Sequence, residues 1–371
     1  MTPSPRVLIV AERDDPDALL MQDRLRRLHG CEATLLDMST FPVEQQAALV
    51  HGSRGTGATA YLGDLDLADV GAVWWRRPRR SAVPSEYYLF DVDFLQVECD
   101  HFLEGLLWSL PAVWVNHPTD EILASRKLHQ LATAARVGLV VPATVVTNDP
   151  ARAREFVESA GGPVITKRIG TTRGLATQTL LISATDIGRL DSIRTCPTLL
   201  QRYIEPGGDV RVVVIGSEQY AFWIDSAAGA NPVDSRIDLR VEHRPLALPE
   251  REEALLHELF RALRLSFGVV DFRVSATGEY NFLEVNPSGQ FGYLEVMTDV
   301  PLFDHLARFL AASAQAASQG LGSDSANATN ASPSRSGGPW PAHTSDGRSA
   351  ASRRIDARLR TGSGVNAAGG S

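Results

Sequence analysis

The sequence predicts a mixed α/β (α+β) protein built from two or three subdomains. Three observations support this fold class. Apolar strand-like runs alternate with helical patterns in the N-terminal third, short β-rich runs separated by glycines follow from about residue 198, and beyond residue 314 the composition changes to Ala, Ser, Gly and Asn. At 371 residues and 44% hydrophobic, the chain is long enough to build more than one core.

The first 117 residues are predicted to form an N-terminal α/β domain. Its expected elements, in order, are a strand at Val7–Val10, a helix at Asp17–Leu28, strands at Ala33–Leu36 and Gly71–Trp75, a long helix at about 85–110, and a strand at 113–116. The turn after the first strand contains no glycine, so its backbone cannot closely approach a pyrophosphate. This excludes a dinucleotide-binding fingerprint.

Residues 118–196 are predicted to form a smaller central subdomain. Thr119 is a suitable N-cap and Gly138 a suitable stop, which predicts one helix over Thr119–Val137. A strand after residue 142, a helix at 151–159 and an apolar strand at Val164–Ile169 are expected to follow.

Residues 197–314 are predicted to form a larger subdomain that opens with an antiparallel meander. Its three strands are expected at 198–204, 210–215 and 220–225, separated by turns at Pro206-Gly207-Gly208 and Gly216-Ser217. A helix over 249–263, a hairpin and a helix over 302–312 complete it. Residues 315–371 are expected to be disordered, because they have too little apolar surface to offset the entropy of ordering.

Composition excludes several function classes. The net charge of −8 argues against nucleic acid as a partner, since such binding requires a surplus of Lys and Arg. The three cysteines lack the spacing of a disulfide framework or a zinc site. The apolar run near the N-terminus is too short for a signal segment or a membrane span, so we expect a cytoplasmic protein without a membrane partner.

Lysine is almost absent from the chain. Of the 36 Lys and Arg residues, only Lys127 and Lys167 are lysine. Lys presents a compact, rotatable charge that suits phosphate oxygens, whereas Arg presents a planar fork. The two lysines are therefore candidate phosphate-binding residues.

A hairpin near residues 268–286 carries the strongest local signal. If the chain turns at Thr277-Gly278, Asp271 faces Glu284, and the alternation of a strand places Asn286 on the same face. The opposite, buried face is then expected to hold Val270, Phe272, Val274, Leu283 and Val285. Two facing carboxylates repel each other unless a cation lies between them, and Mg²⁺ prefers such oxygen ligands. The alternative is an ordinary half-exposed hairpin.

Further candidate residues flank this hairpin. Lys167 on an apolar strand needs an anion, and the Gly170–Gly174 loop with Arg173 can close over phosphates. A hairpin tip rich in Gly and Thr beside a lysine that extends to solvent has the same appearance. The strand end before residue 206 offers backbone and an apolar side chain for a purine, and nearby acids for ribose hydroxyls, although an ordinary polar strand end explains this segment equally well. The residues concerned are Gln201, Tyr203, Ile204, Glu205 and Asp209. Arg211 and Arg273 suit a developing phosphoryl charge, although each alone is more often a surface arginine.

The order of these features resembles the ATP-grasp superfamily over roughly 116–312, behind a pre-ATP-grasp α/β domain. Within it, the runs 75–78, 209–211, 271–273 and 284–291 are similar to the synthetases that mature graspetides, which are ribosomal peptides closed by side-chain esters or amides. Gln201 stands where many relatives carry Glu, and Phe291 where this branch often has Trp.

The resemblance implies an ATP- and Mg²⁺-dependent ligase that works through acyl phosphates. ATP would phosphorylate an Asp or Glu side chain of a precursor peptide with a leader and an acidic core, and a Ser or Thr hydroxyl or a Lys amine would displace phosphate. Lys127 and Lys167 would hold the α- and β-phosphates, Gln201, Tyr203 and Ile204 would frame adenine, and Arg211 would steady the transferred group. Relatives also suggest a homo-oligomer.

Two competing functions remain open from the sequence. A ligase that adds amino acids to a protein terminus or a small molecule would use the same nucleotide residues, and only the Arg76-Arg77-Pro78 run and the region of Gln290 argue against it. A nucleotide-binding regulator without ligase activity is the other alternative. It is disfavoured by the intact Asp271, Glu284 and Asn286.

Overall fold

The structure is a computed structural model that describes residues 6–51, 58–83, 92–170, 178–229, 231, 233 and 241–319. The predicted disordered tail lies outside these residues from position 320 onward, and so does Arg173 of the predicted phosphate loop.

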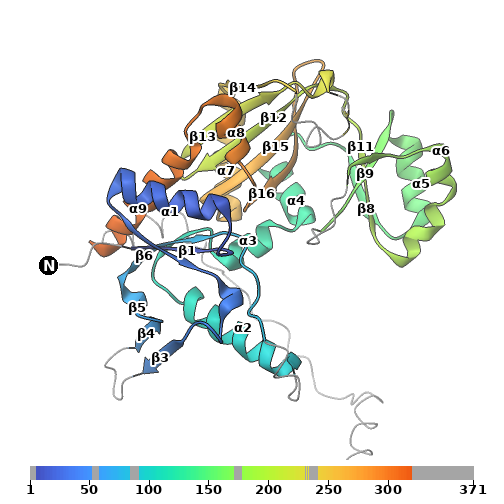
Figure 1. The fold of residues 1–371 in the computed structure, drawn as a ribbon. Helices are drawn as coiled ribbons and strands as arrows, with labels where there is room; N and C mark the ends of the chain where they lie inside the picture. The colour runs from blue at the N-terminus through green and yellow to red at the C-terminus, as the bar shows by residue number, and fades with distance from the viewer. Residues whose placement is uncertain are drawn as a thin grey trace, which may run out of the picture. The chain divides into compact units, whose positions relative to one another are not determined.

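The N-terminal part forms a parallel four-stranded sheet with strand order β2-β1-β6-β7, which confirms the predicted α/β layer (Figure 1). Its elements are β1 (Arg6–Val10), α1 (Pro16–His29), β2 (Glu32–Leu36), β6 (Val70–Trp75), α2 (Val92–Trp108) and β7 (Val113–Val115). The Asp15 side chain caps α1 by accepting from two backbone N–H groups, and Gly30 ends the helix at a positive φ of 57°. A small antiparallel sheet that the sequence did not predict consists of β3 (Ala47–His51), β4 (Ala58–Leu62) and β5 (Leu65–Asp66).

The helix predicted over Thr119–Val137 is two helices, so that prediction was wrong. They are α3 (Pro118–Ala124), capped by His117 rather than Thr119, and α4 (Lys127–Val137), which ends as predicted at Gly138. The break places Lys127 at the first residue of α4 instead of the middle of a longer helix. Its side chain therefore leaves the start of the helix.

A separate four-stranded sheet has the order β10-β9-β11-β8. Its strands are β8 (Thr144–Thr147), β9 (Val164–Lys167), β10 (Leu180–Leu181) and β11 (Thr198–Arg202), with α5 (Pro150–Ser159) and α6 (Ala184–Gly188) between them in sequence. β11 pairs with β8 and β9 through the register Gln201 with Thr144 and with Ile165. The sequence placed this strand in the following meander, and that assignment was wrong.

An antiparallel five-stranded sheet with the order β14-β13-β12-β15-β16 holds the rest of the chain (Figure 1). Its strands are β12 (Pro206–Ile215), β13 (Glu218–Ile224), β14 (His243–Leu246), β15 (Phe267–Ser275) and β16 (Tyr280–Asn286). The predicted turn at 206–208 is instead the start of β12, where Gly208 pairs with Val274. A Cβ on Gly208 would lie only 2.1 Å from the ring of Trp223, so glycine allows that ring to cover the strand.

Three helices complete this part: α7 (Glu250–Leu263), α8 (Gly292–Thr298) and α9 (Leu302–Ser318). α7 begins one residue after the predicted start, whereas α8 was not predicted. α9 continues beyond the predicted end at residue 312 and therefore includes 315–318 of the segment expected to be disordered. Within the described ranges, no helix combines the length and the apolar character needed to cross a membrane.

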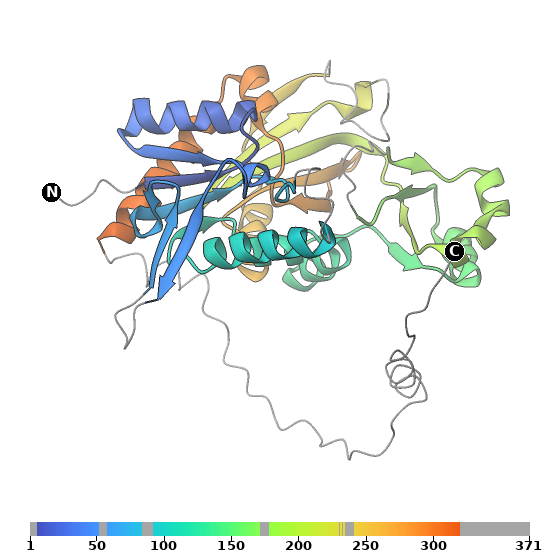
Figure 2. The ribbon, with the colours of Figure 1, turned by 60° about the horizontal axis from the view of Figure 1, so that its bottom comes forward.

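The last helix, α9, packs on both the first and the last sheet (Figure 2). One hydrophobic core joins Ile9 of β1, Trp74 of β6, Val213 of β12 and Val269 of β15 around Leu306 of α9. A Cβ on Gly71 would meet the backbone oxygen of Ala314 at 2.5 Å, so β6 and α9 touch at a point where only glycine fits. This core fixes the ends of β6, β12 and β15 relative to one another.

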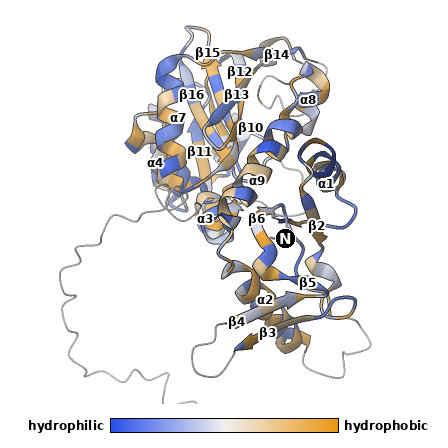
Figure 3. Cartoon of the chain, turned by 90° about the vertical axis from the view of Figure 1, so that its left-hand side faces the viewer, coloured by the Kyte–Doolittle hydropathy of each residue, from blue (hydrophilic) through white to orange (hydrophobic). Residues whose placement is uncertain are grey.

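The strands of the last sheet alternate between two cores. Val213 and Ile215 of β12 face the α9 core, whereas Val212 and Val214 face a second core that includes Leu259 and Phe260 of α7. In Figure 3 the strands of this sheet carry both hydrophobic and hydrophilic residues. Because side chains of a strand alternate between its two faces, the residues of β12 that precede Val212 must also point alternately to these two sides of the sheet.

Candidate functional site

The candidate site begins where the α9 core ends, on the same face of the last sheet. Along β12, Val213 in the core is followed on that face by Arg211 and then Asp209; along β15, Val269 is followed by Asp271 and then Arg273. The register pairs Arg211 with Asp271 and Asp209 with Arg273. Beyond the apolar core, this face of the sheet therefore carries two ion pairs between β12 and β15, Arg211 with Asp271 and Asp209 with Arg273.

Asp271 faces Glu284 across β15 and β16, as the sequence predicted. The turn, however, is different. Gly278, at a φ of 86°, closes a loop that is one residue longer than predicted, and a register shift between Asp271 and Phe272 restores the expected pairing. The two deviations cancel at Asp271.

The register shift changes which residue of β16 enters the core. Phe282 is fully buried among the α7 residues, whereas Leu283, predicted to be on the core face, is only half-buried and lines a pocket. The prediction for Leu283 was wrong because a bulge interrupts the alternation that a regular strand would have.

Each carboxylate of this facing pair has a cationic partner. The Arg211 Nη1 donates to Asp271 Oδ1 at 3.0 Å, and Lys127 Nζ pairs with Glu284 Oε2. Asn286, the third predicted ligand, is exposed, and its Oδ1 accepts from the backbone N–H of Ser288 at 3.2 Å. Lys127 and Glu284 come from elements 157 residues apart, and only the fold brings them together.

Two carboxylates and an amide oxygen form a donor set that fits Mg²⁺, a hard cation that prefers oxygen ligands. Among the residues that the structure describes, no cluster of three or more His, Cys, Asp or Glu side chains offers a site for a metal that needs more protein ligands. The set at Asp271, Glu284 and Asn286 fits an ion that shares its coordination sphere with phosphate oxygens.

A pocket opens on the side of β16 where Leu283 lies. Its lining residues are Ile165, Lys167, Thr179, Gln201, Arg202, Tyr203, Ile204, Val233, Arg273 and Leu283. The sequence had selected Lys167, Gln201, Tyr203, Ile204 and Arg273 as nucleotide or catalytic residues, and the structure brings these five together. The remaining lining residues were missed because nothing in their local sequence marks them.

Polar groups in the pocket are held at fixed positions. Gln201 is fully buried; its Nε2 donates to Thr144 Oγ1 at 2.8 Å, and its Oε1 has no hydrogen-bond partner among the described residues. Lys167 Nζ donates to the backbone oxygen of Leu283 at 3.4 Å. Glu205, predicted as a ribose ligand, is exposed and is not among the lining residues.

Arg273 and Asp209 form a buried ion pair next to the pocket. The guanidinium donates from Nε at 2.7 Å and from Nη2 at 3.1 Å to the two carboxylate oxygens, and both side chains are about nine-tenths buried. The same guanidinium lies 5.6 Å from the ring centre of Tyr203. Burial, opposed by this positive charge, raises the pKa of Tyr203. The structure thus pairs Arg273, which the sequence assigned to the phosphoryl charge, with Asp209, which it assigned to the ribose hydroxyls.

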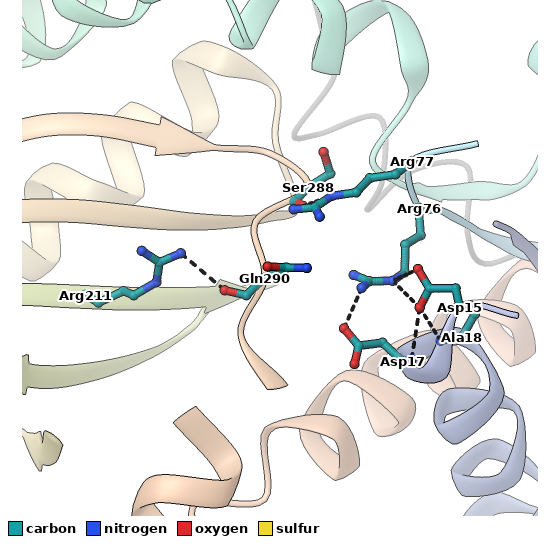
Figure 4. A network of polar contacts seen from close by, with 8 residues as sticks. All are labelled: Asp15, Asp17, Ala18, Arg76, Arg77, Arg211, Ser288 and Gln290. Carbon is teal, nitrogen blue, oxygen red and sulfur yellow. Dashed lines mark hydrogen bonds and ion pairs between the residues drawn. The ribbon is translucent and has the colours of Figure 1, made fainter. Parts of the chain in front are cut away.

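A loop that follows Asn286 connects the site to the N-terminal sheet (Figure 4). Arg77, two residues after the end of β6, donates from Nε at 2.9 Å and from Nη2 at 2.6 Å to the backbone oxygen of Ser288. Its neighbour Arg76 is buried and pairs with Asp15 and Asp17 at the start of α1. The Arg76-Arg77-Pro78 run therefore connects the end of β6 to this loop through Arg77 and to the start of α1 through Arg76.

Glu121 of α3 lies behind the same loop and was not selected from the sequence. Burial raises its pKa to about 7, against opposing contributions from a Ser288 hydrogen bond and the positive charge of Arg77. Its Oε2 is buried and has no hydrogen-bond partner among the described residues. Together with Asp120, Glu121 looks like an ordinary acidic residue in the first turn of a helix, so no local pattern marked it.

Comparison with known proteins identifies the family. A family model described as the RimK-like ATP-grasp domain matches residues 124–310, which is half of the chain. Among curated proteins, a ribosomal protein bS6–L-glutamate ligase of Escherichia fergusonii is 24% identical over 192 residues, covering 50% of this chain and 63% of that protein. The chain thus spans less than two thirds of that relative.

Solved structures match over a longer range. A RiPP-associated ATP-grasp ligase of Chryseobacterium gregarium, solved with ADP and with a leader and core peptide, is 25% identical with a TM-score of 0.75, covering 83% of this chain and 97% of that one. The macrocyclase MdnC of Microcystis aeruginosa, solved with its precursor peptide MdnA, is 27% identical with a TM-score of 0.70, covering 82% and 99%. The predicted fold is confirmed, and the chain belongs to the RimK-like ATP-grasp domain family.

Proposed function

We propose that this chain is an ATP- and Mg²⁺-dependent peptide macrocyclase. It phosphorylates Asp or Glu side chains of a ribosomal precursor peptide and joins them to Ser or Thr hydroxyls, or to Lys amines, of the same peptide. The observation that carries this proposal is the facing pair of Asp271 and Glu284, each with a cationic partner, next in sequence to Leu283 of a pocket that Lys167 also lines.

The pocket is assigned to the nucleotide. Ile165, Ile204 and Leu283 supply apolar surface for a purine, and the buried Oε1 of Gln201 is an acceptor suited to an exocyclic amine. Lys167 at the pocket and Lys127 beside Glu284 would bind successive phosphates. Mg²⁺, when bound by Asp271, Glu284 and Asn286, supplies charge neutralisation to the phosphate oxygens.

The chemistry then needs positioning more than an enzyme nucleophile. An oxygen of the peptide carboxylate attacks the terminal phosphorus and ADP leaves, which forms an acyl phosphate. The hydroxyl or amine attacks the acyl carbon and loses its proton, and phosphate leaves. Arg211, which donates to Asp271 and to the backbone oxygen of Gln290, would stabilise the negative charge that develops on the transferred group.

Two relatives support a peptide as the substrate, since both were solved with a precursor or with leader and core peptides. The named glutamate ligases favour a different reaction, the addition of an amino acid to a protein or small molecule. The structural matches cover nearly the whole of the peptide ligases but the sequence matches cover less than two thirds of the glutamate ligases. We therefore rank the macrocyclase first.

Mass spectrometry separates these functions. The purified protein is incubated with ATP, Mg²⁺ and the acidic peptide encoded next to its gene, and the peptide is weighed. A macrocyclase removes one water per ring, while an amino-acid ligase adds the mass of an amino-acid residue when glutamate is supplied. ADP release with an unchanged peptide mass would contradict the macrocyclase, and binding of ATP without any ADP release would indicate a regulator.

A further inference from the structure

The loop between Asn286 and α8 is held almost entirely through its backbone oxygens. Asn116 Nδ2 donates to Pro287 O at 2.9 Å, Arg77 donates twice to Ser288 O, and Arg211 Nη2 donates to Gln290 O at 3.2 Å. These donors come from the segment after β6, from the residue after β7, and from β12, so three distant parts of the chain hold three residues of this loop. A Cβ on Gly289 would lie 2.6 Å from Val269, so the loop also packs tightly on β15.

The side chain of Gln290 in this loop is available to contact a substrate. Gln290 is exposed, its carboxamide makes no hydrogen bond within the described part of the chain, and its backbone is anchored by Arg211. Figure 4 shows the carboxamide extending from the loop toward the Arg76 and Arg77 side. A rigid backbone with an unoccupied donor and acceptor is the arrangement expected of a recognition group.

The direction of the strands places Gln290 at the reacting end of the proposed nucleotide. Arg273 and Leu283 line the pocket. Asp271 lies two residues before Arg273 on β15, and Glu284 lies one residue after Leu283 on the antiparallel β16, so both lie on the same side of the pocket. The loop comes after Asn286 on that side. A nucleotide with its base in the pocket would extend its phosphates past the carboxylate pair toward this loop. The carboxylate to be phosphorylated must then arrive from the side of Gln290.

Arg77 holds an uncommon backbone conformation that aims it at the loop. Its φ is 47°, in the left-handed region, although it is neither glycine nor asparagine and precedes a proline. The conformation is maintained by the buried pairing of Arg76 with Asp15 and Asp17 and by the Arg76 N–H bond to Val10 O at 2.8 Å. Backbone conformations that cost energy persist where the surrounding structure imposes them, often at functional sites.

We propose that Gln290 contacts the substrate: its carboxamide donates a hydrogen bond to the acidic side chain of the peptide as that side chain meets the terminal phosphate, and Arg77 is the positioning residue that holds the loop. A neutral amide suits this task because it can donate to a carboxylate without adding a charge that competes with Mg²⁺ or Arg211. This inference rests on the proposed macrocyclase function.

The test compares Gln290→Ala, Gln290→Glu and Arg77→Ala with wild-type protein, and uses Gln315→Ala on an exposed position of α9 as the matched control. Peptide kinetics are measured at saturating ATP, the KM for ATP is measured at saturating peptide, and binding of MgADP is measured by calorimetry. Thermal melting checks that each variant folds.

We expect Gln290→Ala to lower kcat/KM for the peptide about 10- to 100-fold, the range for losing one hydrogen bond to a charged group. Gln290→Glu should lower it further, because its carboxylate repels that of the substrate. Arg77→Ala should reduce kcat/KM for the peptide with partial rescue in Arg77→Lys, which keeps one donor. MgADP affinity and the KM for ATP should stay within about twofold of wild type in all of them.

Wild-type peptide kinetics in Gln290→Ala would overturn this inference while leaving the macrocyclase in place. An equal loss of MgADP affinity would also overturn it, because the loop would then serve the nucleotide. If wild-type protein does not change the peptide mass, the proposed function falls and the inference falls with it, so the two failures are distinguishable.

Discussion

Lys127 forms an ion pair with Glu284, which joins the start of α4 to β16. The sequence assigned one of these residues to phosphate and the other to Mg²⁺, and the fold places them in direct contact. Both side chains are largely buried, so each neutralises a charge that would otherwise be costly there. In the proposed complex, a phosphate and a metal ion would enter between two charges that already compensate each other.

Glu284→Gln is expected to remove one metal ligand without changing the shape of the side chain. Turnover should fall about 100- to 1000-fold, the usual cost of losing a group that stabilises transition-state charge, while the melting curve stays that of a folded protein. The matched control is Glu279→Gln, an exposed acid in the turn of the same hairpin, which should retain full activity. Peptide mass after incubation with ATP and Mg²⁺ is the readout, and an active Glu284→Gln would refute the metal assignment.

Lys127→Arg and Lys167→Arg are expected to raise the KM for ATP by about tenfold each, equivalent to one charge-assisted hydrogen bond. Arg keeps the charge but replaces a compact ammonium with a wider planar group. Steady-state kinetics with varied ATP measure the effect, with Arg152→Lys on an exposed face of α5 as the control. If both lysine variants keep the wild-type KM, the two lysines do not bind phosphate.

Glu121 should make the stability of the protein depend on pH. Its folded pKa of about 7 lies above the ordinary 4.5, so its favourable contribution is fully present below pH 4.5 and is lost as the pH rises through 7. Glu121→Gln keeps the neutral form at every pH and should stabilise the protein relative to wild type by on the order of 3 kcal/mol at pH 8, and by less than about 1 kcal/mol at pH 5. Urea unfolding across this pH range measures the difference, and parallel curves for the two proteins would contradict the assignment.

Asp209→Ala is expected to destabilise the fold by about 3 kcal/mol, because it leaves the buried guanidinium of Arg273 without its partner. The control is Asp191→Ala, whose pair with Arg154 is largely exposed and should contribute less than about 1 kcal/mol. Chemical unfolding of both variants gives the comparison. Equal losses would show that the Arg273 pair is not effectively buried in solution.

The facing of Asp271 and Glu284 was determined by sequence alone because it depends on local properties. Alternating apolar residues choose the buried face of each strand, and a glycine in the turn fixes where the chain reverses. The turn itself was predicted one residue too short, and the bulge beside Phe272 compensated for it. The core face of β16 was consequently misassigned at Leu283, although the carboxylate pair was not.

The sequence also located many of the residues that line the pocket, among them Lys167, Gln201 and Tyr203, because their types and order are those of a known family. Their roles toward the nucleotide stay predictions, as do the subdomain boundaries. β11, however, carries Gln201 into the sheet of β8 and β9, and the meander predicted for it does not form. A strand's local pattern does not identify its neighbour, because pairing is decided by non-local contacts.

What the sequence alone determined is the chemistry available here: two lysines among many arginines, and a hairpin with oxygen ligands on one face. Tertiary structure decided which of these groups meet. Lys127 reached Glu284 only because α3 and α4 are separate helices, and Arg77 reached Ser288 only because α9 packs β6 and β15 into one core. The local sequence supplies the charged groups, but their partners depend on packing between distant segments, 60 residues apart for Arg211 and Asp271 and 157 apart for Lys127 and Glu284.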